Sequence, residues 1–221
     1  AGDFLILSKA AMPEALWEMR KKIFQWGKKT PMGSSLITDN CPNTHYSANN
    51  VEHAFDFYRW NKDEFGVFTV LDRLWKVVRA ISGPIPAQLN DARAQEEVVE
   101  KGQILHFPPG TGRKSMQSDF ILHQKANFGF PLTVSGKDYS VGGTFVMVTP
   151  TEKHNVERYV EPGDAVMFFP SLWHGVDTID PSKKADSTKI DGRWYMAGYT
   201  VAPHAEVGVP HLLGLPAADA F

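Results

Sequence analysis

The sequence predicts an α+β protein that is mainly β, in which helices from the N-terminal part pack on a double-stranded β-helix, or jelly-roll, core. Two observations support this prediction. Apolar residues recur at helical spacing before residue 98, and short strand-like segments bounded by Gly or Pro alternate with turns after it. Several short strands are typical of sandwiches and jelly rolls, and helices that precede them are expected to back one face of the sheet.

The length and composition indicate a single domain. The chain has 221 residues, of which 43% are hydrophobic and 22% are charged, and this is enough for one sizeable core. We expect residues 1–97 to form a helical portion, residues 98–203 to form the jelly-roll core, and residues 204–221 to form a C-terminal tail.

Three helices are predicted in the helical portion. The first has apolar residues at helical spacing, with Pro13 just inside its start and Gly27 near its end. The second is capped by Asn49 and would carry an apolar face between Val51 and Tyr58. The third runs from about Phe68 to Ile81, where a Gly- and Pro-rich stretch ends it.

The second half of the chain contains seven predicted strands, most of them bounded by Gly or Pro. They are Gln103–Phe107, Phe128–Val134, Thr144–Val148, Val156–Val160, Ala165–Phe169, His174–Thr178 and Trp194–Val201.

Composition and motifs exclude several functional classes. The formal net charge is −2, so no electrostatic footprint for nucleic acid is present. We find no apolar run long enough to span a membrane. The single cysteine, Cys41, permits no internal disulfide, so we expect a reducing, cytoplasmic location. The sequence also lacks a Gly-x-Ser-x-Gly elbow, a phosphate-binding Gly-rich loop, a dinucleotide-binding fingerprint and a cysteine pair for zinc.

Two side chains in the strand-rich part are candidates for an internal site. His174 follows the apolar run Ala165–Phe169, which comes after a Pro162-Gly163-Asp164 turn, and a small barrel could point it inward. Arg193 follows Gly192 at the start of the last strand. A neutral imidazole suits iron, and a guanidinium suits a carboxylate held by two hydrogen bonds. The sequence therefore predicts a site in which one residue binds a metal and another binds an anion.

The candidates also have structural interpretations. A lone histidine in a strand is more often a hydrogen-bonded residue than a metal ligand, and Asp119 could cap a turn. Arg193 could lie on the surface, although its place between Gly192 and two aromatic residues favours a buried side chain with a partner. We expect His106 in the core.

Residues 103–201 resemble the Fe(II)/2-oxoglutarate-dependent oxygenases, especially their prolyl-hydroxylase-like and phytanoyl-hydroxylase-like branches. The resemblance is carried by His106-Phe-Pro-Pro-Gly110, Gly136-Lys-Asp-Tyr-Ser-Val-Gly-Gly-Thr144, Pro162-Gly-Asp164, His174 and Gly192-Arg193. It implies a jelly-roll enzyme that uses Fe(II), 2-oxoglutarate and dioxygen to hydroxylate, or otherwise oxidise at a C–H bond, a small or medium organic substrate. No motif indicates the substrate or an oligomeric state.

The resemblance also implies roles for individual residues. Oxygenases of this superfamily hold iron with two histidines and one carboxylate on one face. By resemblance, Asp119 and His174 are the catalytic metal ligands, Gln117 is the third metal ligand, and Arg193 binds the far carboxylate of 2-oxoglutarate.

The sequence departs from the family at one ligand position, because it has Gln117-Ser118-Asp119 where His-x-Asp is usual. Four explanations remain open. Gln117 is a weak neutral oxygen ligand, or it is a substitution introduced to silence the enzyme. Alternatively, His123 supplies the missing nitrogen from a shifted strand register, or the site has lost iron chemistry altogether.

Two other functions remain alternatives. One is a non-catalytic or impaired barrel that keeps the carboxylate pocket without productive iron, which the missing histidine favours. The other is a cupin-like metalloenzyme that does not use 2-oxoglutarate. The presence of Arg193 disfavours this alternative, since such an enzyme needs no partner for a far carboxylate.

Overall fold

The computed structural model describes residues 4–28, 45–48, 52–82, 99–119, 126–186 and 188–201. Among them, two sheets form, and neighbouring strands in each run antiparallel. The larger sheet contains, in order, β1 (Phe4–Leu7), β9 (Ala165–Phe168), β6 (Asn127–Pro131), β11 (Arg193–Val201), β4 (Val99–Phe107), β3 (His53–Tyr58) and β2 (His45–Ala48). The smaller sheet contains β5 (Lys114–Gln117), β10 (His174–Asp177), β7 (Gly143–Met147) and β8 (Lys153–Asn155).

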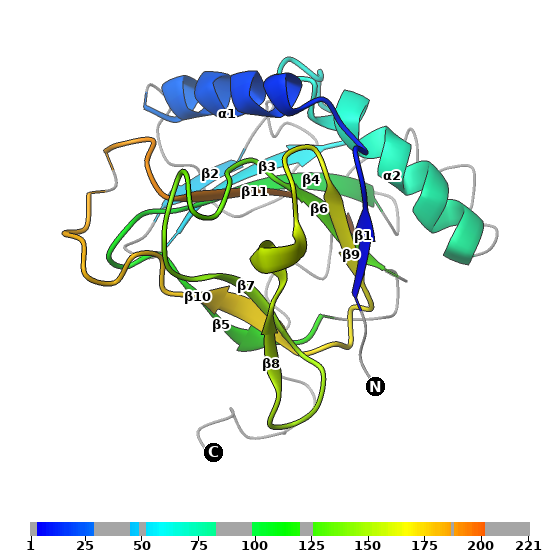
Figure 1. The fold of residues 1–221 in the computed structure, drawn as a ribbon. Helices are drawn as coiled ribbons and strands as arrows, with labels where there is room; N and C mark the ends of the chain where they lie inside the picture. Colours follow the sequence, from blue (N-terminus) through cyan, green and yellow to red (C-terminus); the bar gives the residue numbers. More distant parts are fainter. Residues whose placement is uncertain are drawn as a thin grey trace, which may run out of the picture.

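The two sheets lie opposite each other, and the chain passes repeatedly from one to the other (Figure 1). β4, β6, β9 and β11 belong to the larger sheet, whereas β5, β7, β8 and β10 belong to the smaller one. This alternation along the chain is the arrangement of a jelly roll, and it confirms the predicted fold class.

Helices α1 (Pro13–Gly27) and α2 (Val67–Ser82) cover the outer face of the larger sheet (Figure 1). α1 begins at Pro13, as predicted, and buries Leu16, Ile23 and Phe24 toward the sheet. Burial of each such side chain contributes about 1.5–3 kcal/mol relative to exposure. The first turn of α2 is held by Asp63, whose Oδ2 accepts hydrogen bonds from the backbone N–H of Thr69 (2.9 Å) and from its hydroxyl (3.0 Å).

Trp194 in β11 is the centre of the core between α1 and the sheet. Its ring stacks on Phe55 with centroids 5.9 Å apart and meets Phe24 edge-on at 6.1 Å. His106 stacks on its ring at 4.3 Å and is fully buried, so the prediction that His106 lies in the core is confirmed. Because side chains alternate along a strand, burying Trp194 under the helices turns its neighbours Arg193 and Tyr195 toward the opposite sheet.

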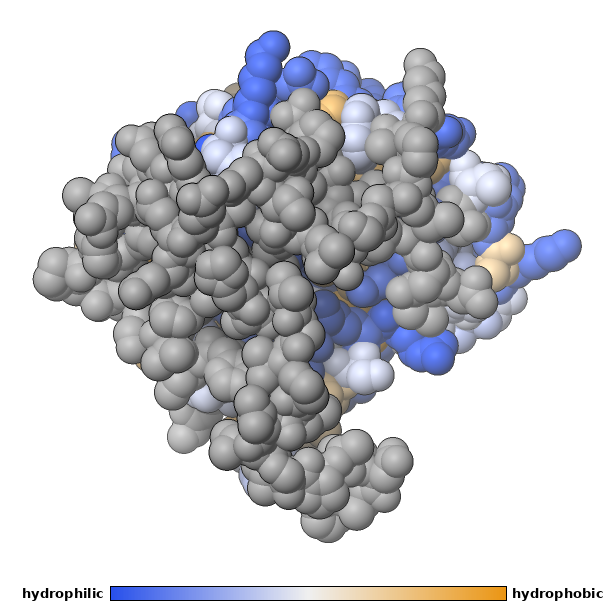
Figure 2. Space-filling view, turned by 180° about the vertical axis from the view of Figure 1, so that it is seen from behind, coloured by the Kyte–Doolittle hydropathy of each residue, from blue (hydrophilic) through white to orange (hydrophobic). Residues whose placement is uncertain are grey.

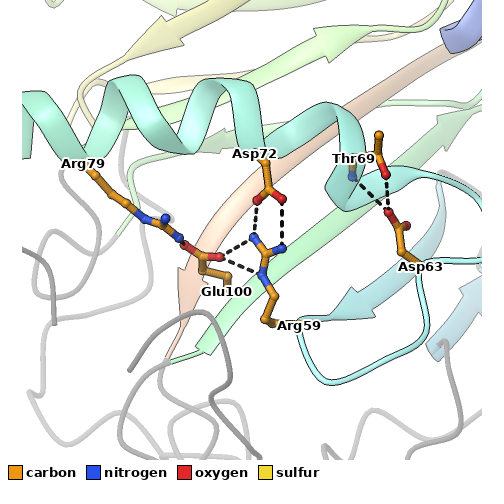
Figure 3. A network of polar contacts seen from close by, with 6 residues as sticks. All are labelled: Arg59, Asp63, Thr69, Asp72, Arg79 and Glu100. Atoms are coloured by element: carbon orange, nitrogen blue, oxygen red, sulfur yellow. Dashed lines mark hydrogen bonds and ion pairs between the residues drawn. The ribbon is translucent and has the colours of Figure 1, made fainter. Parts of the chain in front are cut away.

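An ion-pair network attaches α2 to the sheet (Figure 3). Arg59, which follows β3, donates through Nη2 to Oδ1 of Asp72 on α2 at 2.5 Å and through Nε to Oε2 of Glu100 at 2.9 Å. Arg79, near the end of α2, also donates to Glu100. Glu100 is 1% exposed, so these two arginines compensate a buried carboxylate in β4.

Two predicted elements are wrong. The expected helix between Val51 and Tyr58 is strand β3, which is buried at every position and pairs with β4. A strand between two others that is covered on both faces has no period-two alternation, so its apolar residues were assigned to a helix. The expected strand Val156–Val160 is a short 3-10 helix, η2 (Val156–Tyr159), whose start is capped by the side chain of Asn155.

Four further strands were not predicted in the described part of the chain: β1 and β2 in the N-terminal portion, and β5 and β8 in the smaller sheet. Among the described residues of the N-terminal portion, only α1 and α2 are α-helical. β5 has the sequence Lys-Ser-Met-Gln and is exposed at its two central residues, so it carries no hydrophobic signal.

Seen from the opposite side, the described surface is mainly hydrophilic with small hydrophobic patches (Figure 2). Neither described helix combines the length and the apolar character needed to cross a membrane.

Candidate functional site

A pocket lies inside the jelly roll, with about 520 Å³ of empty space including its open mouth. Much of its lining is apolar and includes Leu105, Phe107 and Phe168. The polar residues that line it are Gln117, Asn127, His174, Lys114, Thr144, Arg193 and the two tyrosines Tyr195 and Tyr199.

Strand β10 and its two neighbouring strands carry four of these polar residues. His174, its first residue, pairs with Gln117 of β5 and Val146 of β7. Val176 pairs with Lys114 on one side and with Thr144 on the other. The pocket therefore has two polar rows that lie two residues apart along β10, or about 7 Å at 3.4 Å per residue.

A β-bulge in β5 brings both Gln117 and Lys114 to the pocket. Between the pairs His174–Gln117 and Val176–Lys114 the register shifts, so three steps along β5 match two along β10. In a regular strand, side chains three residues apart point to opposite faces, so the bulge is what lets Lys114 and Gln117 face the same side.

Asp119 follows β5 and is fixed by several hydrogen bonds. Its backbone N–H donates to the carbonyl oxygen of Pro170 at 2.8 Å. Oδ1 accepts from Nε2 of Gln117 at 3.0 Å, and Oδ2 accepts from Nδ2 of Asn127 at 2.5 Å. Nε2 of His174 lies 3.4 Å from Oδ2. The structure thus brings together Gln117, Asp119 and His174, the three residues that the resemblance implied as metal ligands.

The hydrogen bonds of His174 determine what its Nε2 can do. Nδ1 lies 2.8 Å from the carbonyl oxygen of Leu172, so it carries the proton and donates it. In the neutral ring Nε2 is then an acceptor, and it faces a carboxylate oxygen, which is also an acceptor. Two acceptors in this position repel each other unless a proton or a cation lies between them. The pair formed by Asp119 and His174 therefore fits a bound metal cation.

Gln117 differs from a histidine in what it could offer a metal. Its amide nitrogen is directed at Asp119, and only its amide oxygen could coordinate a metal. The described part of the chain contains no group of three or more His, Cys, Asp and Glu side chains arranged to hold a metal ion. The Gln117 amide is the candidate for a third protein ligand, since it is bound to the Asp119 carboxylate and pairs with His174 across the sheet. His123 lies outside the described residues.

Arg193 lies at the other end of the pocket and is 1% exposed. Its Nε donates to Oε1 of Glu157 at 2.7 Å, Nη2 forms an ion pair with the same oxygen at 2.7 Å, and Nη2 donates to the hydroxyl of Thr144. The guanidinium lies over the rings of Tyr195 and Phe107, at 4.8 Å and 5.4 Å from their centroids. Arg193 is therefore buried with a partner, as the sequence suggested, but that partner belongs to the protein.

The charges of Arg193 and Glu157 compensate each other. Burial alone would raise the pKa of Glu157, but Arg193 and the backbone N–H of Thr144, 3.0 Å from Oε1, hold the pKa below its ordinary value. Burial opposes the charge of Arg193, yet Glu157 raises the pKa of the guanidinium. Both groups are thus ionised at neutral pH, and the pair has no net charge. Burial raises the pKa of the neighbouring Tyr195, so its hydroxyl stays protonated.

Sequence reasoning missed Glu157, Thr144, Lys114 and Asn127. One local signal was present for Glu157. A Cβ at Gly143 would lie 2.5 Å from Cγ of Glu157, and the φ of Gly143 is +108°, so glycine is needed there to make room for the buried glutamate. No comparable signal marks Lys114 or Asn127, whose positions depend on strand pairing.

No family model and no curated protein sequence matches the chain. Solved structures with a similar fold include the following three. A Pseudomonas putida prolyl-4-hydroxylase has a TM-score of 0.56 at 10% identity, with 90% of this chain and 92% of that chain covered. A Trichoplax adhaerens prolyl hydroxylase, solved with a hypoxia inducible factor oxygen degradation domain peptide fragment, has a TM-score of 0.52 at 9% identity, with 92% and 84% covered.

The third is an oxidoreductase of the 2OG-Fe(II) oxygenase family from Burkholderia pseudomallei, with a TM-score of 0.52 at 12% identity and coverage of 91% and 84%. At these identities the likeness concerns the fold alone. The chain thus has the jelly-roll fold of three proteins whose names describe prolyl hydroxylases or 2OG-Fe(II) oxygenases.

Proposed function

We propose that the protein is an Fe(II)- and 2-oxoglutarate-dependent oxygenase that oxidises a C–H bond of a small or medium organic molecule. One observation carries the proposal. His174 and the buried Arg193 line the same pocket of a jelly roll, one polar row apart, and Nε2 of His174 faces Oδ2 of Asp119 to form an acceptor pair that suits a cation.

The metal would be held by Oδ2 of Asp119, Nε2 of His174 and the amide oxygen of Gln117. With 2-oxoglutarate bound, ferrous iron would supply dioxygen activation, so that substrate, dioxygen and 2-oxoglutarate give oxidised substrate, succinate and carbon dioxide.

The chain's own residues would prepare the site for this chemistry. The carbonyl of Leu172 fixes the tautomer that leaves Nε2 of His174 free to coordinate. Asn127 orients Oδ2 of Asp119. Leu105 and Phe107 keep water from the space between the two polar rows, where the co-substrate would lie.

A second candidate is a barrel that binds ligands without productive iron. The hydrogen bond from the Gln117 amide to Asp119 favours this function, since it uses the carboxylate to satisfy an amide and an amide is a weaker donor to iron than an imidazole.

A third candidate is a cupin-like metalloenzyme that does not use 2-oxoglutarate. The pairing of Arg193 with Glu157 favours it, because that pair needs no external carboxylate.

The test measures metal content, co-substrate binding and turnover separately. The purified protein is loaded with Fe(II) without dioxygen, titrated with 2-oxoglutarate, and then exposed to dioxygen while succinate is measured. We expect stoichiometric iron, a visible absorption change on addition of 2-oxoglutarate, and iron-dependent succinate. Iron binding without 2-oxoglutarate binding would favour the cupin-like enzyme, and weak iron binding the non-catalytic barrel.

A pair of variants links this result to the site. Asp119→Ala should abolish iron binding, since it removes the only carboxylate among the three ligands. Asp177→Asn is the matched control, because it removes a carboxylate at the end of β10 that pairs with Lys153 on the surface. Equal iron loss in both variants would contradict the assignment.

A further inference from the structure

Arg193 has no spare charge to offer a dicarboxylate. Its Nε and Nη2 are bound to Glu157, and both side chains are almost fully buried. Displacing Glu157 would leave a carboxylate buried and unpaired, which is strongly unfavourable. Within the described residues, the N–H groups on Nη1 make no hydrogen bond, so Arg193 can still donate to a ligand, but as part of a neutral pair.

Lys114 is the second cationic side chain that lines the pocket. Its ammonium forms no ion pair and no hydrogen bond with any described residue, although the pocket around it is largely apolar. The β5 bulge is what turns it inward. Lys114 therefore contributes an uncompensated positive charge to the pocket, and it does so because β5 has a bulge at this place.

Lys114 belongs to the same end of the pocket as Arg193. Lys114 and Thr144 flank Val176 on its two neighbouring strands, and Thr144 accepts a hydrogen bond from Nη2 of Arg193. Adjacent strands lie about 4.8 Å apart, so the flexible lysine side chain has the length to reach the region above Val176. This row is about 7 Å from the row of Gln117 and His174, a span that suits the distance between the two ends of 2-oxoglutarate.

We infer that Lys114 supplies the net positive charge that binds the far carboxylate of 2-oxoglutarate, with Arg193 and Thr144 as neutral hydrogen-bonding partners and Glu157 as the residue that positions Arg193. The inference rests on the proposed function and deepens it. It reassigns the charged contact, which the family resemblance placed on Arg193 alone, to a lysine on β5.

The test uses two ligands that share a chelating end but differ at the far end. N-Oxalylglycine, an unreactive analogue of 2-oxoglutarate, has the far carboxylate, whereas oxalate lacks it. Calorimetry measures the binding of each to protein loaded with Mn²⁺ as a redox-stable substitute for Fe²⁺. Lys114→Met should weaken N-oxalylglycine binding about 10- to 100-fold, the size of one charge-assisted hydrogen bond, and should leave oxalate binding unchanged.

Two further variants complete the design. Lys114→Arg should recover most of the affinity, because it restores the charge. Lys76→Met removes an equal charge from an exposed position on α2 and should change neither ligand's affinity. Unchanged N-oxalylglycine binding in Lys114→Met, or an equal loss for oxalate, overturns the role of Lys114 while the proposed function stands. Failure of the unaltered, metal-loaded protein to bind N-oxalylglycine overturns both.

Discussion

Oδ2 of Asp119 lies 3.4 Å from Nε2 of His174, and both atoms are hydrogen-bond acceptors when the imidazole is neutral. Gln117, the strand partner of His174, holds the other oxygen of the same carboxylate. This arrangement suits a cation at one end of a pocket whose other end carries Arg193 and Lys114.

Gln117→His should tighten Fe(II) binding by about tenfold or more, because a neutral imidazole is a better donor to ferrous iron than an amide. Turnover of 2-oxoglutarate should rise with it. Iron affinity is measured by competition with a chelator, and Gln117→Ala is the control that removes the amide without adding a ligand. No gain over the unaltered protein would indicate that the site has lost iron chemistry and would favour the non-catalytic barrel.

Asn127→Leu should lower metal affinity about 10- to 100-fold, although Asn127 is not a proposed ligand. Its Nδ2 donates to Oδ2 of Asp119 at 2.5 Å and so orients the coordinating oxygen. Metal titration of the variant checks this result. Asn127→Asp would place a second carboxylate beside Asp119 and serves as a contrast. An equal loss of metal affinity in both variants would indicate general damage to β6 instead.

Arg193→Lys should weaken 2-oxoglutarate binding even though the charge is kept. Lysine cannot reproduce the planar fork that contacts Glu157 and Thr144 while leaving Nη1 for a ligand. Calorimetry with 2-oxoglutarate gives the affinity, and circular dichroism of the variant confirms that it is folded. Unchanged affinity in a folded variant would remove Arg193 from the co-substrate site.

Glu157→Gln should destabilise the protein by about 3–5 kcal/mol, because it leaves the buried guanidinium without a counter-charge. The same change should tighten 2-oxoglutarate binding, since Arg193 then has a full charge to offer. Urea unfolding with and without 2-oxoglutarate measures both effects. A variant that is less stable and also binds 2-oxoglutarate less tightly would contradict the expectation that the freed charge of Arg193 strengthens co-substrate binding.

Acidification should destabilise the fold well before its carboxylates are protonated. Burial lowers the pKa of His106 from an ordinary value of 6.5 to about 3, although the carbonyl oxygen of Asp191 is bonded to Nε2. Burial also lowers the pKa of His53, whose ring lies 5.1 Å from that of His106. The unfolded chain therefore binds more protons below pH 6.5, and stability falls as the pH drops from there toward 3.

The slope from one such histidine is at most about 1.4 kcal/mol per pH unit. Urea unfolding between pH 7.5 and pH 5 checks the prediction. His106→Gln removes the titrating ring and should flatten the slope, even if the variant is less stable at every pH. An unchanged slope would show that His106 is not responsible.

Regular patterns allowed much of the fold to be predicted from the sequence. α1 and α2 have apolar residues at helical spacing and Pro or Gly near their ends, and both lie where they were expected. Most jelly-roll strands were found because turns separate short apolar runs. β3 was mistaken for a helix because a strand buried at every position lacks alternation, and β5 was missed because its central residues are exposed.

The candidate site divides in the same way. Asp119, His174 and Arg193 could be named from local motifs and from their order along the chain. Glu157, Asn127 and Lys114 could not, because only the tertiary structure places Glu157 beside Arg193, Asn127 beside Asp119 and Lys114 on the pocket wall. The sequence alone thus determined the fold class and which residues stand at the candidate ligand positions. The tertiary structure decided the net charge at each end of the pocket, because that charge depends on which side chains the two sheets place together.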